Sequence, residues 1–243
     1  MTSPEGTIAA PKQGGVFEDL IEVLFAPTKV FDRSRAAKAI MYVLITAVIV
    51  AVIVFATKNL IMPWLDAQAD LTLKIAAAKG KPIPDAAVSS IRTTTSYSIL
   101  IGAPLIMLIG PYINALFLVI GAKLMKAPIS FAQAALIATL GGVPRILGWL
   151  ALPVQALLLN SSSAKGLADF SLGPARFLDP ATTSPAVLAL LSNLDIFRLW
   201  QIALIAIGVS VVGRVSKSTG VLVAIVMAGI AAILQLIPSA FFG

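Results

Sequence analysis

Residues 93–122 read TTTSYSILIGAPLIMLIGPYINALFLVIGA, thirty consecutive positions without a formal charge. A helix needs about 20 apolar residues to cross the hydrocarbon core of a bilayer, at about 1.5 Å rise per residue. Further apolar stretches of comparable length follow and precede this one. The five predicted spans lie near residues 39–62, 94–122, 131–159, 196–213 and 218–241. The predicted fold class is therefore all-α, a polytopic helical membrane protein with five transmembrane helices and amphipathic surface helices.

The composition agrees with this class and limits the chemistry. Charged residues make up 12% of the 243 positions, against about 25% in ordinary soluble domains. Histidine and cysteine are absent, which removes the commonest general base, the usual zinc ligands and every disulfide. The 11 acidic residues are scattered, and none lies inside a predicted span. We expect no catalytic residue, no metal site and no cofactor, so the protein is predicted not to be an enzyme.

The net charge of +7 is interpreted as a membrane feature, because the cations are dispersed at helix ends instead of forming one basic run. We therefore expect no nucleic acid among the partners. Cations occupy the approach to the first span (Lys29, Arg33, Arg35 and Lys38) and two short connections between spans that contain no acidic residue (Lys123 and Lys126, Arg214 and Lys217). The positive-inside rule assigns these segments to the cytoplasm. This predicts a multi-pass protein of the plasma (inner) membrane with its N-terminus cytoplasmic and its C-terminus outside.

The chain divides into a disordered N-terminal tail, residues 1–15, and a membrane domain, residues 16–243. Residues 16–25 have the spacing of an amphipathic helix. Its acidic face suits anionic headgroups poorly, so we expect it to dock on the basic inner side of its own bundle. Residues 64–79 are predicted to form a separate helix on the outer interface that stops at Gly80. Ser184 and Pro185 are predicted to start another short helix.

Proline and glycine are expected to interrupt two of the spans. The predicted helix breaks are Pro104, Gly110, Pro111, Gly142 and Pro144. Freed carbonyls in such a helix must be satisfied by neighbouring helices, water or polar side chains. Breaks of this kind can mark substrate sites in transporters, although Pro and Gly are frequent in membrane helices in any case.

Arg145 is the one formal charge between Lys126 and Lys165. In a single third span it would lie near the middle, where an arginine costs about 2.5 kcal/mol or more and is usually paired. We predict a polar intramembrane cluster of Arg145, Gln201 and Gln235, with Asn114 somewhat nearer the inside. Alternatively, residues 131–141 lie along the inner surface and Arg145 is an interfacial anchor. Asp195 and Arg198 are expected to form a local pair at the start of the fourth span.

Several segments carry a resemblance to a known family. The polar tail and the lead-in with Pro27, Thr28 and Phe31 precede five spans. Two further segments are GAKLMKAPISFAQAALIATLGGVPRILGWL, residues 121–150, and NLDIFRLWQIALIAIGVSVVGRVSKSTG, residues 193–220. Over about residues 16–240 the chain resembles the Yip1 domain family. The resemblance implies a small membrane protein without catalytic residues. Eukaryotic members are linked to vesicle traffic, and some prokaryotic relatives accompany ABC-type export systems.

Two functions follow as hypotheses. The first is a non-enzymatic integral membrane protein that acts as a scaffold, as an accessory subunit of a membrane or transport complex, or in membrane organisation. Its expected partners are membrane lipids and a membrane protein, either an ABC-type exporter or another copy of itself. The alternative is a carrier or permeation path for a lipid or small anion, with Arg145 as the charge-selecting group.

Overall fold

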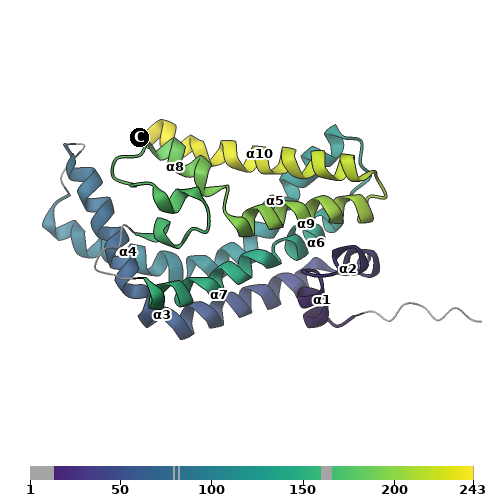
Figure 1. Ribbon diagram of the computed structural model, residues 1–243, viewed down its shortest axis with the longest axis horizontal. Coiled ribbons are helices and arrows are strands. Elements are labelled where there is room, and N and C mark those ends of the chain that lie inside the picture. Colours follow the sequence, from purple (N-terminus) through teal and green to yellow (C-terminus); the bar gives the residue numbers. More distant parts are fainter. Residues whose placement is uncertain (1–13, 79, 82, 160–165, 243) are drawn as a thin grey trace, which may run out of the picture.

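The computed structural model describes residues 14–78, 80–81, 83–159 and 166–242, so most of the predicted N-terminal tail lies outside the described residues. The described residues are mainly helical, and the longest helices run along the long axis of the molecule (Figure 1). The elements are α1 (Val16–Glu22), α2 (Pro27–Arg33), α3 (Ala39–Ala78), α4 (Asp85–Leu100), α5 (Gly102–Leu124), α6 (Phe131–Gly141), α7 (Val143–Leu158), the 3₁₀ turns η2 (Leu167–Phe170) and η3 (Pro174–Phe177), α8 (Pro185–Ser192), α9 (Ile196–Val212) and α10 (Lys217–Phe242).

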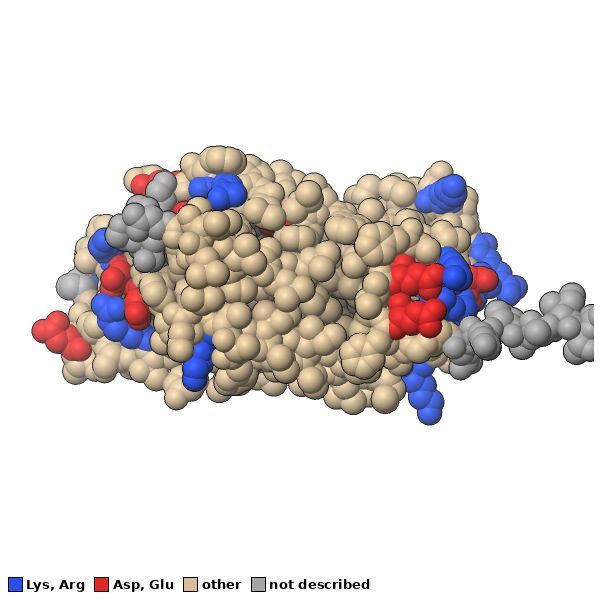
Figure 2. Space-filling view, turned by 60° about the horizontal axis from the view of Figure 1, so that its bottom comes forward, with Lys and Arg blue, Asp and Glu red and all other residues tan. Residues whose placement is uncertain are grey.

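Four elements are by themselves long and apolar enough to cross a membrane: α3, α5, α6 joined to α7, and α10. A fifth crossing is made if α8 and α9 count as one span, although these two helices meet at a bend of 55°. The predicted fold class, an all-α polytopic membrane protein, is confirmed, with four to five spans. On the face shown in Figure 2, charged side chains gather toward the two ends of the molecule and leave a broad, almost uncharged belt between them.

The first span differs from the prediction. Instead of a span followed by a separate surface helix, α3 is one helix of 40 residues with Pro63 inside it. At about 1.5 Å per residue it is about 60 Å long, roughly twice the hydrocarbon core. Proline removes only one backbone donor, and packing on both sides of it offsets that loss. Trp64, 2% exposed, contacts Phe170 of η2 at 4.6 Å between ring centroids. The predicted stop at Gly80 is confirmed by its left-handed backbone, φ 70°.

The predicted helix breaks have mixed outcomes. Helix α4 ends at Leu100. In a continuous helix the backbone N–H of residue 104 would bond the Leu100 carbonyl, but Pro104 has no N–H, so the predicted break at Pro104 is confirmed. The interruption predicted at Gly110 and Pro111 is wrong, because α5 continues through both residues. Proline inside a helix is tolerated in membrane bundles, where neighbouring helices, water or polar side chains can satisfy the freed carbonyl. Gly142 separates α6 from α7, and Pro144 lies in the first turn of α7, where its missing donor is not needed.

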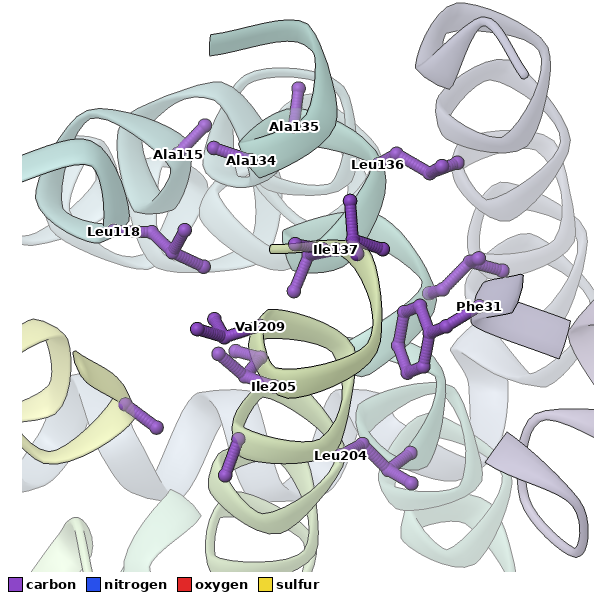
Figure 3. Packing of buried hydrophobic residues seen from close by; sticks show 14 of the residues in the cluster. Phe31, Ala115, Leu118, Ala134, Ala135, Leu136, Ile137, Leu204, Ile205 and Val209 are labelled. Carbon is purple, nitrogen blue, oxygen red and sulfur yellow. The ribbon is translucent and has the colours of Figure 1, made fainter. Parts of the chain in front are cut away.

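The main core lies between α2, α5, α6, α9 and α10 (Figure 3). Phe31 of α2 is fully buried among these helices. A Cβ on Gly208 of α9 would lie 2.9 Å from the Phe31 ring, so the absence of a side chain at that position lets the ring enter. The short helix α2 is thereby inserted into the bundle and does not rest loosely on it.

We call the end that holds α1, α2 and the α9–α10 turn the cationic end (Figure 1, right). We call the opposite end, which holds α4, α8 and the 3₁₀ turns, the loop end (Figure 1, left).

Candidate functional site: a cleft with two arginines and a polar network

A cleft of about 570 Å³ opens among the helices at the loop end. Its walls come from α3, α7, η2, α8, α9 and α10, segments far apart in the sequence. The polar side chains that line it are Gln68, Arg145, Ser171, Ser192, Asn193, Asp195, Arg198 and Gln235. The other lining residues are mainly apolar. The cleft therefore combines hydrophobic walls with a few polar groups, as ligand sites usually do.

Arg145 projects from α7 and is exposed to this cleft. Its position is close to the midpoint of Phe131–Leu158, which counts as one candidate span of 28 residues. Within the part of the chain that the structure describes, no hydrogen bond and no carboxylate within 4.0 Å satisfies its guanidinium. Arg145 therefore carries a charge near the middle of a span, and its N–H groups are available to bind a ligand.

Arg198 of α9 lines the same cleft and was not identified as a site residue from sequence. It is 9% exposed and donates from Nη1 to Oε1 of Gln201 at 3.0 Å. The expected pair with Asp195 is wrong. Asp195 instead caps α9, because its Oδ1 accepts from the Phe197 amide at 2.9 Å and its Oδ2 from the Leu172 amide at 2.7 Å. The sequence does contain a signal for this bond, because Arg198 and Gln201 are three residues apart and therefore share one helix face.

The structure distributes the predicted polar cluster over two neighbouring spaces. Arg145, Gln201 and Asn114 line a cavity of about 50 Å³, to which Gly110, Pro111 and Gly142 also contribute. Gln235 lies at the larger cleft, where its Oε1 accepts from Nδ2 of Asn193 at 2.9 Å. Among the described atoms, Arg145 forms no hydrogen bond with any of the other three, and Gln201 bonds Arg198 instead. Pro104 and Pro144 line neither space.

Side chains of the surrounding helices fix the rim of the cleft. Gln68 of α3 accepts from the Leu167 amide at 3.0 Å, and Gln155 of α7 donates to the Phe170 carbonyl at 3.2 Å. With the bond from Leu172 to Asp195, three helices hold the η2 segment. The cleft is thus organised before any ligand binds.

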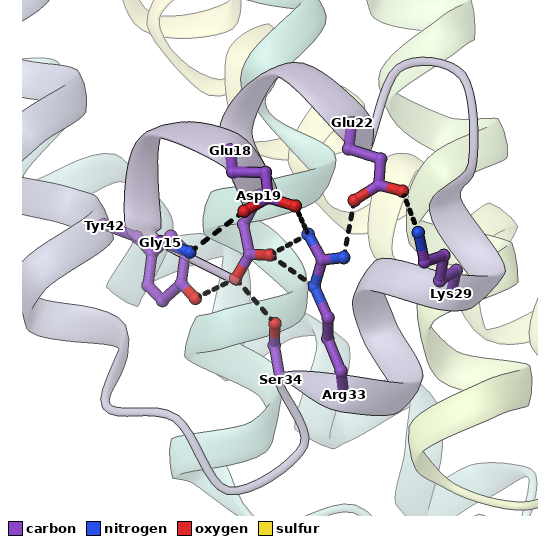
Figure 4. Close-up of polar contacts among 8 residues, drawn as sticks. All are labelled: Gly15, Glu18, Asp19, Glu22, Lys29, Arg33, Ser34 and Tyr42. Carbon is purple, nitrogen blue, oxygen red and sulfur yellow. Dashed lines mark hydrogen bonds and ion pairs between the residues drawn. The ribbon is translucent and has the colours of Figure 1, made fainter. Parts of the chain in front are cut away.

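A separate polar network, centred on Asp19, lies at the cationic end (Figure 4). Asp19 is 2% exposed. One of its oxygens accepts from Arg33 Nε at 2.7 Å, and the other accepts from Ser34 Oγ at 2.9 Å and from the Tyr42 hydroxyl. Asp19 on α1 thereby joins the end of α2 and the first turn of α3. The expectation that the acidic face of this amphipathic helix docks on its own bundle is confirmed.

Glu22 extends the network toward solvent. Its Oε1 lies 2.7 Å from Lys29 Nζ, and its Oε2 lies 2.5 Å from Arg33 Nη1. The hydrogen bond from Lys29 and those from Arg33 lower the pKa of Glu22 against the opposing effect of burial. Burial acts to lower the pKa of Arg33, but its bonds to Asp19 and Glu22 outweigh that effect and raise it. Both groups are therefore charged at neutral pH.

Acidification is expected to weaken this network through Glu22. A carboxyl group whose pKa is lowered on folding stabilises the fold above its unfolded pKa, ordinarily 4.5. That stabilisation disappears as the pH falls through the lower, folded value. We expect the gap in thermal midpoint between the wild type and Glu22→Gln to shrink from neutral pH to about 3.5. The exposed neighbour Glu18 is the control, and a gap that does not change with pH would contradict the assignment.

The network binds parts of the chain together, whereas the cleft leaves donors free, so the cleft is the candidate ligand site. Comparison with curated proteins and with solved structures gives no match. The model of the Yip1 domain matches residues 21–237, nearly the whole of the chain. The matched range includes α3 to α9, both ends of the bundle and every residue of the cleft. The protein therefore belongs to the Yip1 domain family.

Proposed function

We propose that the protein is a non-enzymatic membrane scaffold, or an accessory subunit of a membrane complex, which acts by association at its cationic end. The observation that carries this proposal is the Asp19 network. In this network a buried aspartate and its three side-chain partners hold one amphipathic helix in a fixed position. All three side-chain bonds of Asp19 go to other segments of this chain and none is left for a ligand. The network therefore fixes the position of α1, and with it the surface that α1 presents.

The fixed helix presents apolar side chains on its other face. Phe17 and Ile21, four residues apart on α1, are 62% and 65% exposed, and Phe25, in the turn that follows the helix, is 80% exposed. Asp19 bonds Tyr42, which lies in the first turn of a membrane span. A helix at that depth lies in the interfacial zone, where apolar side chains enter the boundary between headgroups and acyl chains. We infer that lipid of the adjacent leaflet covers this stripe and that it widens the footprint of the bundle there.

The same end offers a charged surface for a partner. Its exposed lysines are Lys29, Lys38, Lys123, Lys126 and Lys217. Under the positive-inside rule this surface faces the cytoplasm, where it would meet anionic headgroups and acidic segments of a partner protein. A membrane-protein partner, an ABC-type exporter or another copy of this chain, would bind beside the interfacial helix.

Photo-crosslinking in native membranes tests the association. A photoreactive amino acid replaces Lys123 or Lys217, both exposed at the cationic end, and Val223, fully buried in α10, is the matched control position. We expect adducts larger than the monomer from the two exposed positions and none from Val223. Recovery of monomer alone from both exposed positions would contradict the scaffold role.

A further inference from the structure

We propose that Arg145 and Arg198 form a binding site for a phosphate group at the cleft of the loop end, and that a phospholipid supplies this group. The inference concerns the end of the molecule opposite to the scaffold surface and does not rest on the scaffold role. Arg145 comes from α7 and Arg198 from α9, and both line the same cleft of about 570 Å³.

The first argument is charge. Both guanidinium groups line the same cleft, which brings two like charges to one space. Asp195 is the one carboxylate among the described residues that line the cleft, and each of its oxygens already accepts a backbone N–H. Like charges inside a bundle of membrane helices are costly unless an opposite charge compensates them. The cleft therefore carries an excess of positive charge, which an anion would offset.

The second argument is the supply of donors. Arg145 has five N–H groups without a hydrogen bond to any described residue, and Arg198 uses one of its own on Gln201. The planar fork of a guanidinium matches two oxygens of a phosphate group. A phosphate group offers enough oxygens for both arginines at once, whereas a halide offers no such geometry. Charge-assisted hydrogen bonds of this kind are shorter and stronger than those between neutral groups.

The walls indicate the source of the phosphate. Leu71, Trp149, Leu152, Leu167, Phe170, Leu188 and Phe197 contribute most of the lining that is not polar. A free phosphate ion would occupy a small part of the volume and leave these side chains facing water. The glycerol and upper acyl carbons of a phospholipid would cover them, which releases water from apolar surface. A phospholipid would contact both the arginines and the apolar walls of the cleft, whereas free phosphate would contact only the arginines.

Thermal shift measurements on the full-length protein in a phosphate-free maltoside detergent test the site. Three probes are compared: a short-chain phosphatidylglycerol, the diacylglycerol with the same chains, and inorganic phosphate. We expect the phospholipid to raise the unfolding midpoint in a concentration-dependent manner, since a ligand that binds only the folded state stabilises it. Diacylglycerol is expected to give no shift. An equal shift with inorganic phosphate would support the arginine site but overturn its lipid source.

Substitutions then locate the binding. Arg145→Gln and Arg198→Gln are each expected to weaken the apparent affinity about tenfold or more. Without lipid, the midpoint of Arg145→Gln is expected to equal or exceed that of the wild type, because an unpaired charge is removed from the bundle. If Arg145 instead stabilised the fold, Arg145→Gln would lower the unfolding midpoint. Arg145→Lys keeps the charge without the fork, and it is expected to retain part of the affinity.

Arg176→Gln is the matched control, since Arg176 lies at the loop end on η3 but does not line the cleft. It should bind the phospholipid as the wild type does. A full lipid-induced shift in both Arg145→Gln and Arg198→Gln would overturn the proposal, as would an equal shift with diacylglycerol.

Discussion

Asp19→Ala is expected to release α1 from the bundle. The substitution removes the acceptor of three side-chain hydrogen bonds, from Arg33, Ser34 and Tyr42. The side chain of Arg33, 9% exposed, keeps only its contacts to Glu22 and the distant one to Glu18. Removal of one partner from a buried ion pair costs roughly 3–5 kcal/mol. Amide hydrogen exchange measures the result, and protection over residues 16–26 should fall by about a hundredfold or more.

Glu18→Ala is the control for this prediction. Glu18 lies beside Asp19 on the same helix, but its side chain is 61% exposed and 3.9 Å from Arg33. Exposed pairs of this kind contribute about 1 kcal/mol at most, so its exchange pattern should remain close to that of the wild type. Unchanged protection in Asp19→Ala would show that apolar contacts alone hold α1, and the scaffold proposal would lose its main support.

Gly220→Ala is expected to destabilise the α9–α10 hairpin strongly. A Cβ at this position would lie 2.3 Å from the backbone carbonyl oxygen of Ala206. A backbone atom cannot rotate aside as a side chain can, so the two helices would have to separate. Close approach through small residues is what joins membrane helices, and overpacking of this kind costs typically 1–3 kcal/mol or more. Thermal unfolding in detergent should show a clearly lower midpoint and a reduced folded yield.

Gly229→Ala, in the same helix, supplies a close comparison. A Cβ there meets nothing within 4 Å. Alanine is the better helix former by about 1 kcal/mol, so its midpoint should equal or exceed that of the wild type. If the two alanine variants behave alike, the contact between Gly220 and Ala206 does not hold the hairpin together.

Much of the architecture could be predicted because it depends on local patterns. Long apolar runs identify the spans, and the acidic face of residues 16–25 predicts docking on a basic surface. Ser184 and Pro185 predict the start of α8, where the Ser184 hydroxyl accepts from the Val187 amide at 3.3 Å. Each of these signals acts over a few residues, so one chain is enough to identify it.

The rest depends on contacts between helices, which a single sequence does not encode in its periodicity. The course of α3 through Pro63 depends on Trp64 and on the η2 segment about a hundred residues later. The partner of Gln235 is Asn193 on a different element. Proximity in the sequence predicts a pair between Arg198 and Asp195. The carboxylate of Asp195 instead accepts from Leu172, a residue that only the folded structure places beside it.

Because α3 is one continuous helix, it connects the cationic end of the molecule directly to the loop end. Its first turn receives Tyr42's bond to Asp19, and 26 residues later Gln68 holds the cleft rim; the separation is about 39 Å along the axis. A ten-degree tilt about the midpoint of this segment would swing each tip sideways by roughly 3 Å. A displacement of α1 at the cationic end would therefore reach the rim of the cleft through one continuous helix.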